Sequence, residues 1–129
     1  MKARGPSLAS SVDRIGQPIS SFQAIQHILA DMATQTEAAR ALVYASARMV
    51  DSGAKSVAKE SAMAKLFASD TAMKVTVDAV QVLGGAGVLA SSPVDRLYRS
   101  VRALRIYEGT TEIQHLVIAG QLLAGEGAA

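Results

Sequence analysis

The sequence contains no cysteine and only two histidines, and these shortages exclude several kinds of site. Without cysteine there can be no disulfide, no thiolate zinc site and no cysteine nucleophile. His27 and His115 lie far apart in the sequence, so we expect no metal site. A formal net charge of only +2 does not by itself indicate a nucleic-acid or anionic-membrane partner.

Long apolar runs are also missing. No uninterrupted run reaches the roughly 18 residues that cross a bilayer, so no membrane span is expected. The polar N-terminal segment lacks the apolar core of a secretory signal. We therefore expect a soluble, cytoplasmic chain.

The chain does contain abundant apolar, helix-forming sequence. Its 129 residues correspond to one domain. With 50% apolar and 19% charged residues, it is apolar enough to fold around a core. Aromatic residues make up 4%, and alternating runs of β-branched residues are few, which argues against a sheet protein. The pattern predicts an all-α fold.

A first long helix is predicted from Phe22 to about residue 52. Apolar side chains recur there at spacings of three and four, which places them in one stripe. Ser20 and Gln23 have the spacing of a capping box at the start, and Gly53 offers a left-handed cap at the end.

A second long helix is predicted from about Ser56 to Leu83. It ends at the glycine-rich residues 84–87. Asp70 falls within its apolar row and would need a partner if it were buried. That row is formed by Met63, Leu66, Met73, Val77 and Val80.

Two shorter helices follow. Ser92 and Pro93 suit the cap and first turn of a third helix, which should run to about Ile106. Thr111 and Gln114 have the spacing of a second capping box, at the start of a fourth helix. The apolar side of this fourth helix consists of Ile113, Leu116, Val117 and Leu123.

Together these segments predict an antiparallel helical bundle of two long and two shorter helices. Long helices need neighbours along their full length, because packing supplies most of their stability. Residues 1–15 are too few and too polar to form a further long helix. We therefore expect a partner chain or a second copy to cover part of the apolar surface.

The arginines of the third helix do not indicate a nucleic-acid site. At 100° per residue, Arg96 and Arg105 point to opposite sides of a helix, whereas a stripe that follows phosphates needs them on one face. A solvated helix with local ion pairs explains these residues better.

The segment from Ile106 to Gln114 is the best candidate for chemistry. Glu108 lies one residue before a glycine and just ahead of a helix start, where backbone N–H groups favour anionic ligands. It could act as a general base. The alternative, which spacing alone favours, is that Glu108 is an exposed turn residue and Glu112 complements the helix dipole.

Three blocks of sequence, in order and in register, resemble the C-terminal helical domain of acyl-CoA dehydrogenases. They are residues 16–26 with 29–32, residues 78–85, and residues 96–99 together with 106–110. The resemblance implies a fold like that four-helix domain, with its first long helix missing or shortened. It divides the chain into a disordered or partly ordered segment (1–15), the helical domain (16–123) and a flexible tail (124–129).

The resemblance also implies a reaction. It is the FAD-dependent oxidation of an acyl-CoA thioester to the trans-2-enoyl-CoA, with electron-transfer flavoprotein as the acceptor. Glu108 stands at the base position of the short- and medium-chain branches and would remove the α-proton. Tyr107 and Gly109 would contact the substrate. The residues implied to contact FAD are Phe22, Gln23, Gln81, Val82, Leu83, Gly84, Gly85, Thr110, Thr111 and Glu112. Of these, residues 81–85 resemble an element that reaches the FAD of a neighbouring subunit.

The chain also departs from the family pattern. Val12 and Ile15 stand where an arginine and a phenylalanine are usual, and Ser100 replaces an aspartate. The N-terminal helical domain, the β-domain and the first helix of the bundle are absent. We therefore expect a fragment, a subunit of a split enzyme or a remnant, completed by other domains, a complementary chain or a homo-oligomer. The alternative is a non-catalytic helical oligomerisation module.

Overall fold

The computed structural model describes residues 16–126, and every regular element in that range is helical. The all-α prediction is confirmed, with two long and two shorter α-helices in the expected order. The predicted N-terminal segment 1–15 lies outside the described residues. The elements, with η for a short 3-10 helix, are η1 (Ile19–Ser21), α2 (Gln23–Asp51), α3 (Ala58–Leu83), η2 (Gly84–Val88), α4 (Pro93–Ala103) and α5 (Thr111–Glu126).

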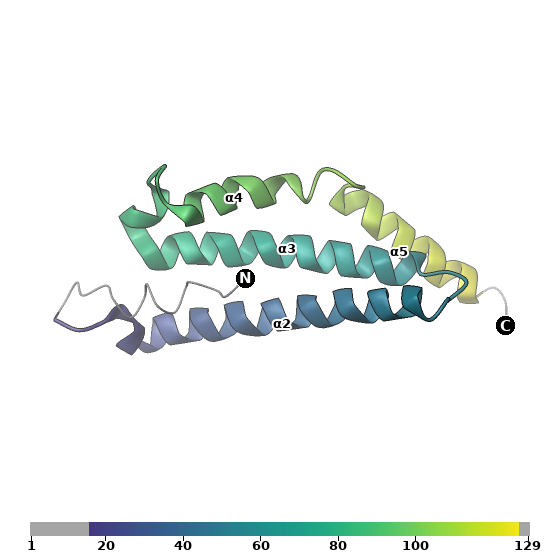
Figure 1. Cartoon of the computed structure of the whole chain (residues 1–129), viewed down its shortest axis with the longest axis horizontal. Coiled ribbons are helices and arrows are strands. Elements are labelled where there is room, and N and C mark those ends of the chain that lie inside the picture. Colours follow the sequence, from purple (N-terminus) through teal and green to yellow (C-terminus); the bar gives the residue numbers. More distant parts are fainter. Residues whose placement is uncertain (1–15, 127–129) are drawn as a thin grey trace.

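Helix α3 lies at the centre of the molecule. It packs against α2 on one side and against α4 and α5 on the other, and both α2 and α4 run antiparallel to it (Figure 1). The Lys74 ammonium links the two long helices, because it contacts Asp31 of α2 as well as Asp78 of its own helix, the latter at 2.9 Å. Hydrogen bonds to these two carboxylates raise the pKa of Lys74 to about 12.

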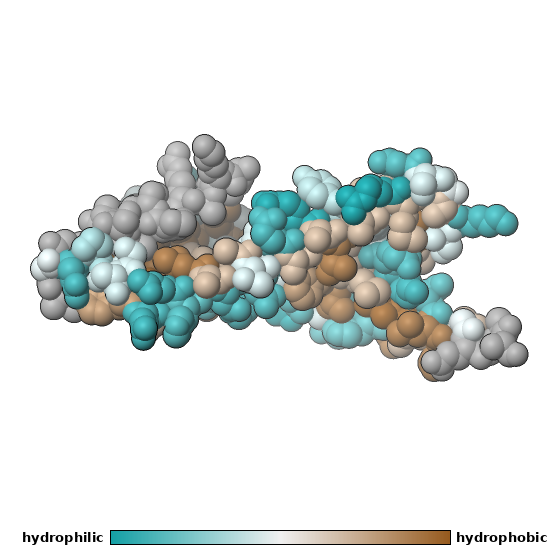
Figure 2. All heavy atoms as spheres, turned by 90° about the horizontal axis from the view of Figure 1, so that it is seen from below, coloured by the Kyte–Doolittle hydropathy of each residue, from teal (hydrophilic) through white to brown (hydrophobic). Residues whose placement is uncertain are grey.

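The buried apolar residues of the described range have small side chains. They are Ala39, Ala62 and Ala64, and the Ser46 and Ser61 hydroxyls lie 3.1 Å apart. No large side chain in this range is fully enclosed. Figure 2 shows the consequence: apolar surface is open on this face and continues to the end of α5. The helices form a thin layer whose larger apolar side chains remain partly exposed.

The start of α2 differs from the prediction, because Ser20 and Gln23 do not form a capping box. The residues after Pro18 form the tight turn η1, in which the Ser21 hydroxyl donates to the Pro18 carbonyl at 2.7 Å. Proline fixes its own φ near the value that such a turn requires. Helix α2 then begins after Phe22, which caps it without a side-chain hydrogen bond.

The end of α2 matches the prediction. Gly53 has a φ of +75°, and the N–H of Ala54 donates to the carbonyl of Met49 at 3.1 Å, which is the pattern of a glycine-terminated helix. Helix α3 begins at Ala58, two residues after the expected start at Ser56, and ends at Leu83 as predicted.

Helix α4 has the predicted cap. The Ser92 hydroxyl accepts a hydrogen bond from the Val94 N–H at 3.3 Å, and Pro93 occupies the first turn. The helix ends at Ala103, three residues before the predicted end at Ile106. It ends early because the Ala103 carbonyl accepts from the N–H of Ile106, at 2.9 Å, in a tight turn.

The cap predicted for α5 is wrong by one residue. Thr110, not Thr111, accepts the hydrogen bond from the Ile113 N–H, at 3.3 Å, and Thr111 is the first helical residue. Gln114 does not complete a capping box, because its side chain is bound to backbone carbonyls that precede the helix. The helix continues through Glu126, beyond the expected end at Leu123.

Candidate functional site

The connection between α4 and α5, residues 104–110, closes on itself. The N–H of Thr111 donates to the carbonyl of Arg105 at 3.2 Å, which joins the two ends of the connection. The N–H of Tyr107 donates to the carbonyl of Ala103 at 3.1 Å. This compact joint presents Glu108 at its outer side, where the side chain is exposed.

Glu108 has an unusual backbone conformation. Its φ is +56°, and it is the only non-glycine residue with a positive φ among those described. Gly109 follows with a φ of +88°. Residues with side chains rarely adopt this left-handed region, and they persist there when the surrounding structure holds them. Two consecutive left-handed residues therefore need stabilising contacts.

Two side chains from separate helices supply those contacts. The amide nitrogen of Gln114, in α5, donates to the carbonyls of both Glu108 and Gly109 at 3.2 Å. The Lys65 ammonium, in α3, donates to the Gly109 carbonyl at 2.5 Å. Gln114 is buried, with 8% of its surface exposed, so this arrangement forms part of the packing between α3 and α5.

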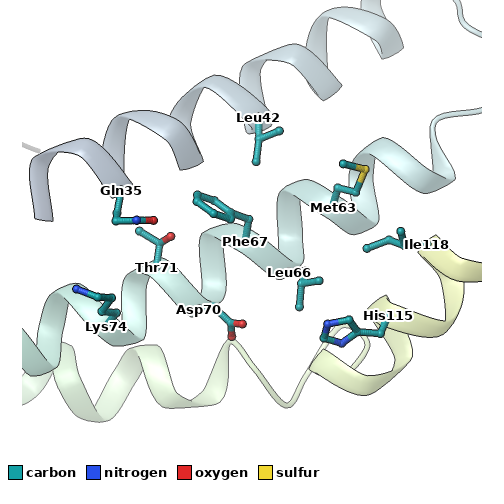
Figure 3. A pocket seen from close by; sticks show the side chains of 10 residues that line it. All are labelled: Gln35, Leu42, Met63, Leu66, Phe67, Asp70, Thr71, Lys74, His115 and Ile118. Carbon is teal, nitrogen blue, oxygen red and sulfur yellow. The ribbon is translucent and has the colours of Figure 1, made fainter. Parts of the chain in front are cut away.

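A third contact ties the other end of the joint to α3. Arg105 Nε lies 2.7 Å from Asp70 Oδ1, although the N–H does not have hydrogen-bond alignment with this oxygen. Asp70 points toward the connection between α4 and α5 (Figure 3). Asp70 is only partly buried, so the condition under which the sequence analysis expected a partner does not apply, but its carboxylate has Arg105 as an ion-pair partner. Because both side chains are partly exposed, the pair contributes orientation more than stability.

The first turn of α5 leaves one polar group without a partner among residues 16–126, beside a carboxylate. The Glu112 N–H and the Thr110 hydroxyl donate to the Glu112 carboxylate and lower its pKa. Thr111 is 8% exposed, and its hydroxyl oxygen has no hydrogen-bond partner within residues 16–126. The N–H groups of this turn are already bound, that of Thr111 to the Arg105 carbonyl and that of Ile113 to the Thr110 hydroxyl, so the helix start does not offer the free anion-binding N–H groups that the sequence predicted. The Thr111 hydroxyl is the hydrogen-bonding group that a ligand could engage.

The remaining residues predicted to contact FAD lie elsewhere. Phe22 and Gln23 begin α2, and residues 81–85 end α3, so both groups lie at the same end of the layer (Figure 1). Lys65, beside the joint, and Gln81 are separated by roughly 24 Å of helix at about 1.5 Å per residue. The structure brings Tyr107, Glu108 and Gly109 together with residues 110–112, but not with this second group.

A groove with a volume of about 690 Å³ lies between α2, α3 and α5. Figure 3 shows side chains from all three helices converging on it. It combines apolar side chains with amide, carboxylate, ammonium and imidazole groups. The residues that line it are Gln35, Leu42, Met63, Leu66, Phe67, Asp70, Thr71, Lys74, His115 and Ile118.

The sequence analysis did not predict that Lys65 belongs to the candidate site, and it placed Gln114 only in a helix cap. No local motif could have found the contact of Lys65, because 44 residues separate it from Gly109. Within residues 16–126, no group of three histidine, aspartate or glutamate side chains could hold a metal ion. None of the helices described is both long enough and apolar enough to cross a membrane.

Comparison with models of known protein families identifies the family of this chain. The model of the acyl-CoA dehydrogenase C-terminal domain matches residues 7–123. The chain belongs to the acyl-CoA dehydrogenase family. An acyl-CoA dehydrogenase of Bacillus subtilis is 50% identical over 112 residues, which cover 87% of this chain and 29% of the relative.

Solved structures of the family have the same helical arrangement. The chain is similar to butyryl-CoA dehydrogenase from Megasphaera elsdenii, with a TM-score of 0.91, 43% identity, and coverage of 94% of this chain and 31% of that one. It is also similar to PigA in complex with FAD, with a TM-score of 0.86, 29% identity, and coverage of 92% and 30%. The chain thus spans about 30% of the length of each of these proteins.

Proposed function

We propose that this chain is the C-terminal catalytic part of an FAD-dependent acyl-CoA dehydrogenase, in which Glu108 is the general base. The observation that carries the proposal is the conformation of the joint. In this member of the family, Glu108 is the one left-handed non-glycine residue among those described. Gln114 of α5 binds its carbonyl, and Lys65 of α3 binds the carbonyl of the next residue, Gly109. Strained residues of this kind are concentrated at functional sites.

The proposed reaction is the oxidation of an acyl-CoA thioester to the trans-2-enoyl-CoA. The Glu108 carboxylate takes the α-proton, and the electron pair of that C–H bond becomes the new double bond as hydride leaves the β-carbon. FAD, when bound, accepts this hydride. The flanking residues Tyr107 and Gly109 contact the substrate.

The chain's own residues fit one end of a flavin cofactor. In this proposal the first turn of α5 receives the cofactor through Thr110, Thr111 and Glu112, and the free hydroxyl of Thr111 is one of its contacts. Residues 81–85 contact the FAD of a neighbouring subunit, and Phe22 and Gln23 contact the adenine side of FAD. These residues lie far from residues 110–112 at the start of α5. This separation supports their assignment to a different FAD molecule or to a different part of FAD.

The open surfaces support completion of the site by additional helices. The groove between α2, α3 and α5 and the exposed apolar residues are faces that further packing would cover. We propose that they receive other domains, a complementary chain or a second copy of this chain. Electron-transfer flavoprotein is the proposed electron acceptor, and an acyl-CoA is the substrate.

A visible absorption spectrum tests this function. The purified chain is mixed with FAD, desalted and then given butyryl-CoA. Retained flavin absorbance that bleaches with butyryl-CoA supports the proposal, provided that Glu108→Gln keeps the flavin but does not bleach. Glu37→Gln is the matched control, because Glu37 is exposed on α2, and it should bleach like the unmodified chain. Bleaching that survives in Glu108→Gln contradicts the role of Glu108.

A second candidate function is a non-catalytic helical oligomerisation module. The exposure of Leu116 and Leu123, at 67% and 70%, favours this candidate because apolar surface of this kind is typical of interfaces. A colourless protein after the FAD experiment that nevertheless sediments as an oligomer would support it. A flavin-binding chain that bleaches would exclude it.

A further inference from the structure

Lys65 occupies a position that no local feature of the joint explains. It lies in α3, and its ammonium crosses to the carbonyl of Gly109 at 2.5 Å. The side chain is partly buried between α3 and the joint. A hydrogen bond from a charged donor is stronger than one between neutral groups. Lys65 is therefore suited to fix the orientation of this one peptide group.

That peptide group is connected to Glu108 through Gln114. Gln114 binds the carbonyls of Glu108 and Gly109 together, and Lys65 binds the second of them from the opposite helix. With both carbonyls turned toward these donors, the backbone of Glu108 stays left-handed and its side chain faces outward. If one donor is lost, Glu108 can relax to an ordinary negative φ, which redirects its carboxylate.

We propose that Lys65 is a positioning residue for Glu108, acting through the carbonyl of Gly109. This inference rests on the proposed function for its catalytic consequence, but its structural part is independent of any reaction. The charge and reach of the side chain are the properties that matter. Arginine retains both, whereas methionine retains the apolar stem and loses the donor.

The first test is nuclear magnetic resonance of the isotope-labelled chain. Lys65→Met should shift the Cα and Cβ signals of Glu108 away from left-handed values while circular dichroism retains the helical signal. Lys65→Arg should restore those signals. Lys59→Met is the matched control, because Lys59 lies on the same helix and contacts only its neighbour Glu60, at 3.4 Å, among the ion pairs of residues 16–126. Unchanged Glu108 signals in folded Lys65→Met would overturn the proposal.

A measurement on the unmodified chain decides the question if Lys65→Met does not fold. A lysine ammonium held by a carbonyl exchanges its protons slowly, whereas one in free solvent exchanges them quickly. We expect a slowly exchanging ammonium signal for Lys65 and none for Lys59. Equally fast exchange at the two lysines would contradict the proposal.

The catalytic consequence has a separate readout. In the FAD and butyryl-CoA experiment, Lys65→Met should retain flavin but bleach about 10- to 100-fold more slowly, since small misplacements of a reacting group cost that much. Lys65→Arg should recover the rate. If the unmodified chain itself does not bleach, the proposed function fails, and the resonance measurements still decide the structural role of Lys65. Normal bleaching in Lys65→Met would show that Lys65 does not position Glu108.

Discussion

The side-chain amide of Gln114 occupies the space in which a β-carbon of residue 109 would lie. A β-carbon built on Gly109 would overlap the Gln114 amide nitrogen, which donates to the carbonyls of residues 108 and 109. The Gln114 amide can therefore reach these carbonyls only because residue 109 has no side chain. This arrangement explains how a short joint keeps two left-handed residues at the head of α5.

Gly109→Ala should destabilise the chain by about 2 kcal/mol. The change forces a side chain into the left-handed region, at about 1–2 kcal/mol, and it displaces the Gln114 amide from its carbonyls. Gly120→Ala is the control, because it lies within α5 with no atom near the added carbon. Urea unfolding should show a gain of up to about 1 kcal/mol for the control. Equal effects of the two changes would contradict the arrangement described.

Ser92→Ala should lower the free energy of unfolding by about 1 kcal/mol. Ser92 is buried and its hydroxyl caps α4 by accepting from the Val94 N–H, and loss of such a cap costs about that much. Ser91→Ala removes an exposed hydroxyl next to it and should have little effect. Chemical denaturation of both variants measures the difference. A larger loss for Ser91→Ala would mean that the cap is assigned to the wrong residue.

The carboxylate of Glu112 should make stability depend on pH. Hydrogen bonds from its own N–H and from the Thr110 hydroxyl lower its pKa from the ordinary value of 4.5. A group with a lowered pKa stabilises the fold above the unfolded-state pKa, and this contribution is lost as pH falls through the folded-state pKa. The melting temperature of Glu112→Gln should thus be below that of the unmodified chain at pH 7, and the gap should close toward pH 3. If the difference in melting temperature between the two proteins increased as the pH fell, the assigned direction of the pKa shift would be wrong.

The exposed apolar side of α5 should drive self-association. Leu116 and Leu123 are seven residues apart, so they share a helix face, and both are largely exposed. The double change Leu116→Lys and Leu123→Lys should shift sedimentation toward the monomer. Changing Gln121 to lysine alters a polar exposed residue of the same helix and provides the control. An unmodified chain that is monomeric at micromolar concentration would exclude this interface.

The sequence predicted the elements better than it predicted their ends. The apolar spacing identified all four α-helices, and Gly53 and Ser92 marked two boundaries because each acts through its nearest neighbours. Ser20 failed as a cap because Pro18 starts a turn that the helical pattern does not reveal. Thr110 and Thr111 are both good caps, so spacing alone could not choose between them.

The candidate site was predicted only in part. Glu108 could be placed on a joint before a helix, since the glycine and the threonines are local signals. The hydrogen bond from Lys65 to the Gly109 carbonyl forms because α3 packs beside the joint. No local sequence pattern could have predicted this hydrogen bond. The groove likewise arises from three helices that are distant in the sequence.

A chimera tests the central claim most directly. In it, residues 16–123 of this chain replace the corresponding segment of the Bacillus subtilis acyl-CoA dehydrogenase, and acyl-CoA-dependent flavin reduction is measured by stopped-flow absorbance. We predict that the chimera binds FAD and reduces it with butyryl-CoA, and that Glu108→Gln retains the flavin but slows its reduction by about 10²- to 10⁴-fold, the range for a general base. A folded, flavin-bound chimera that cannot be reduced, or one that reduces equally fast with Glu108→Gln, would contradict the account.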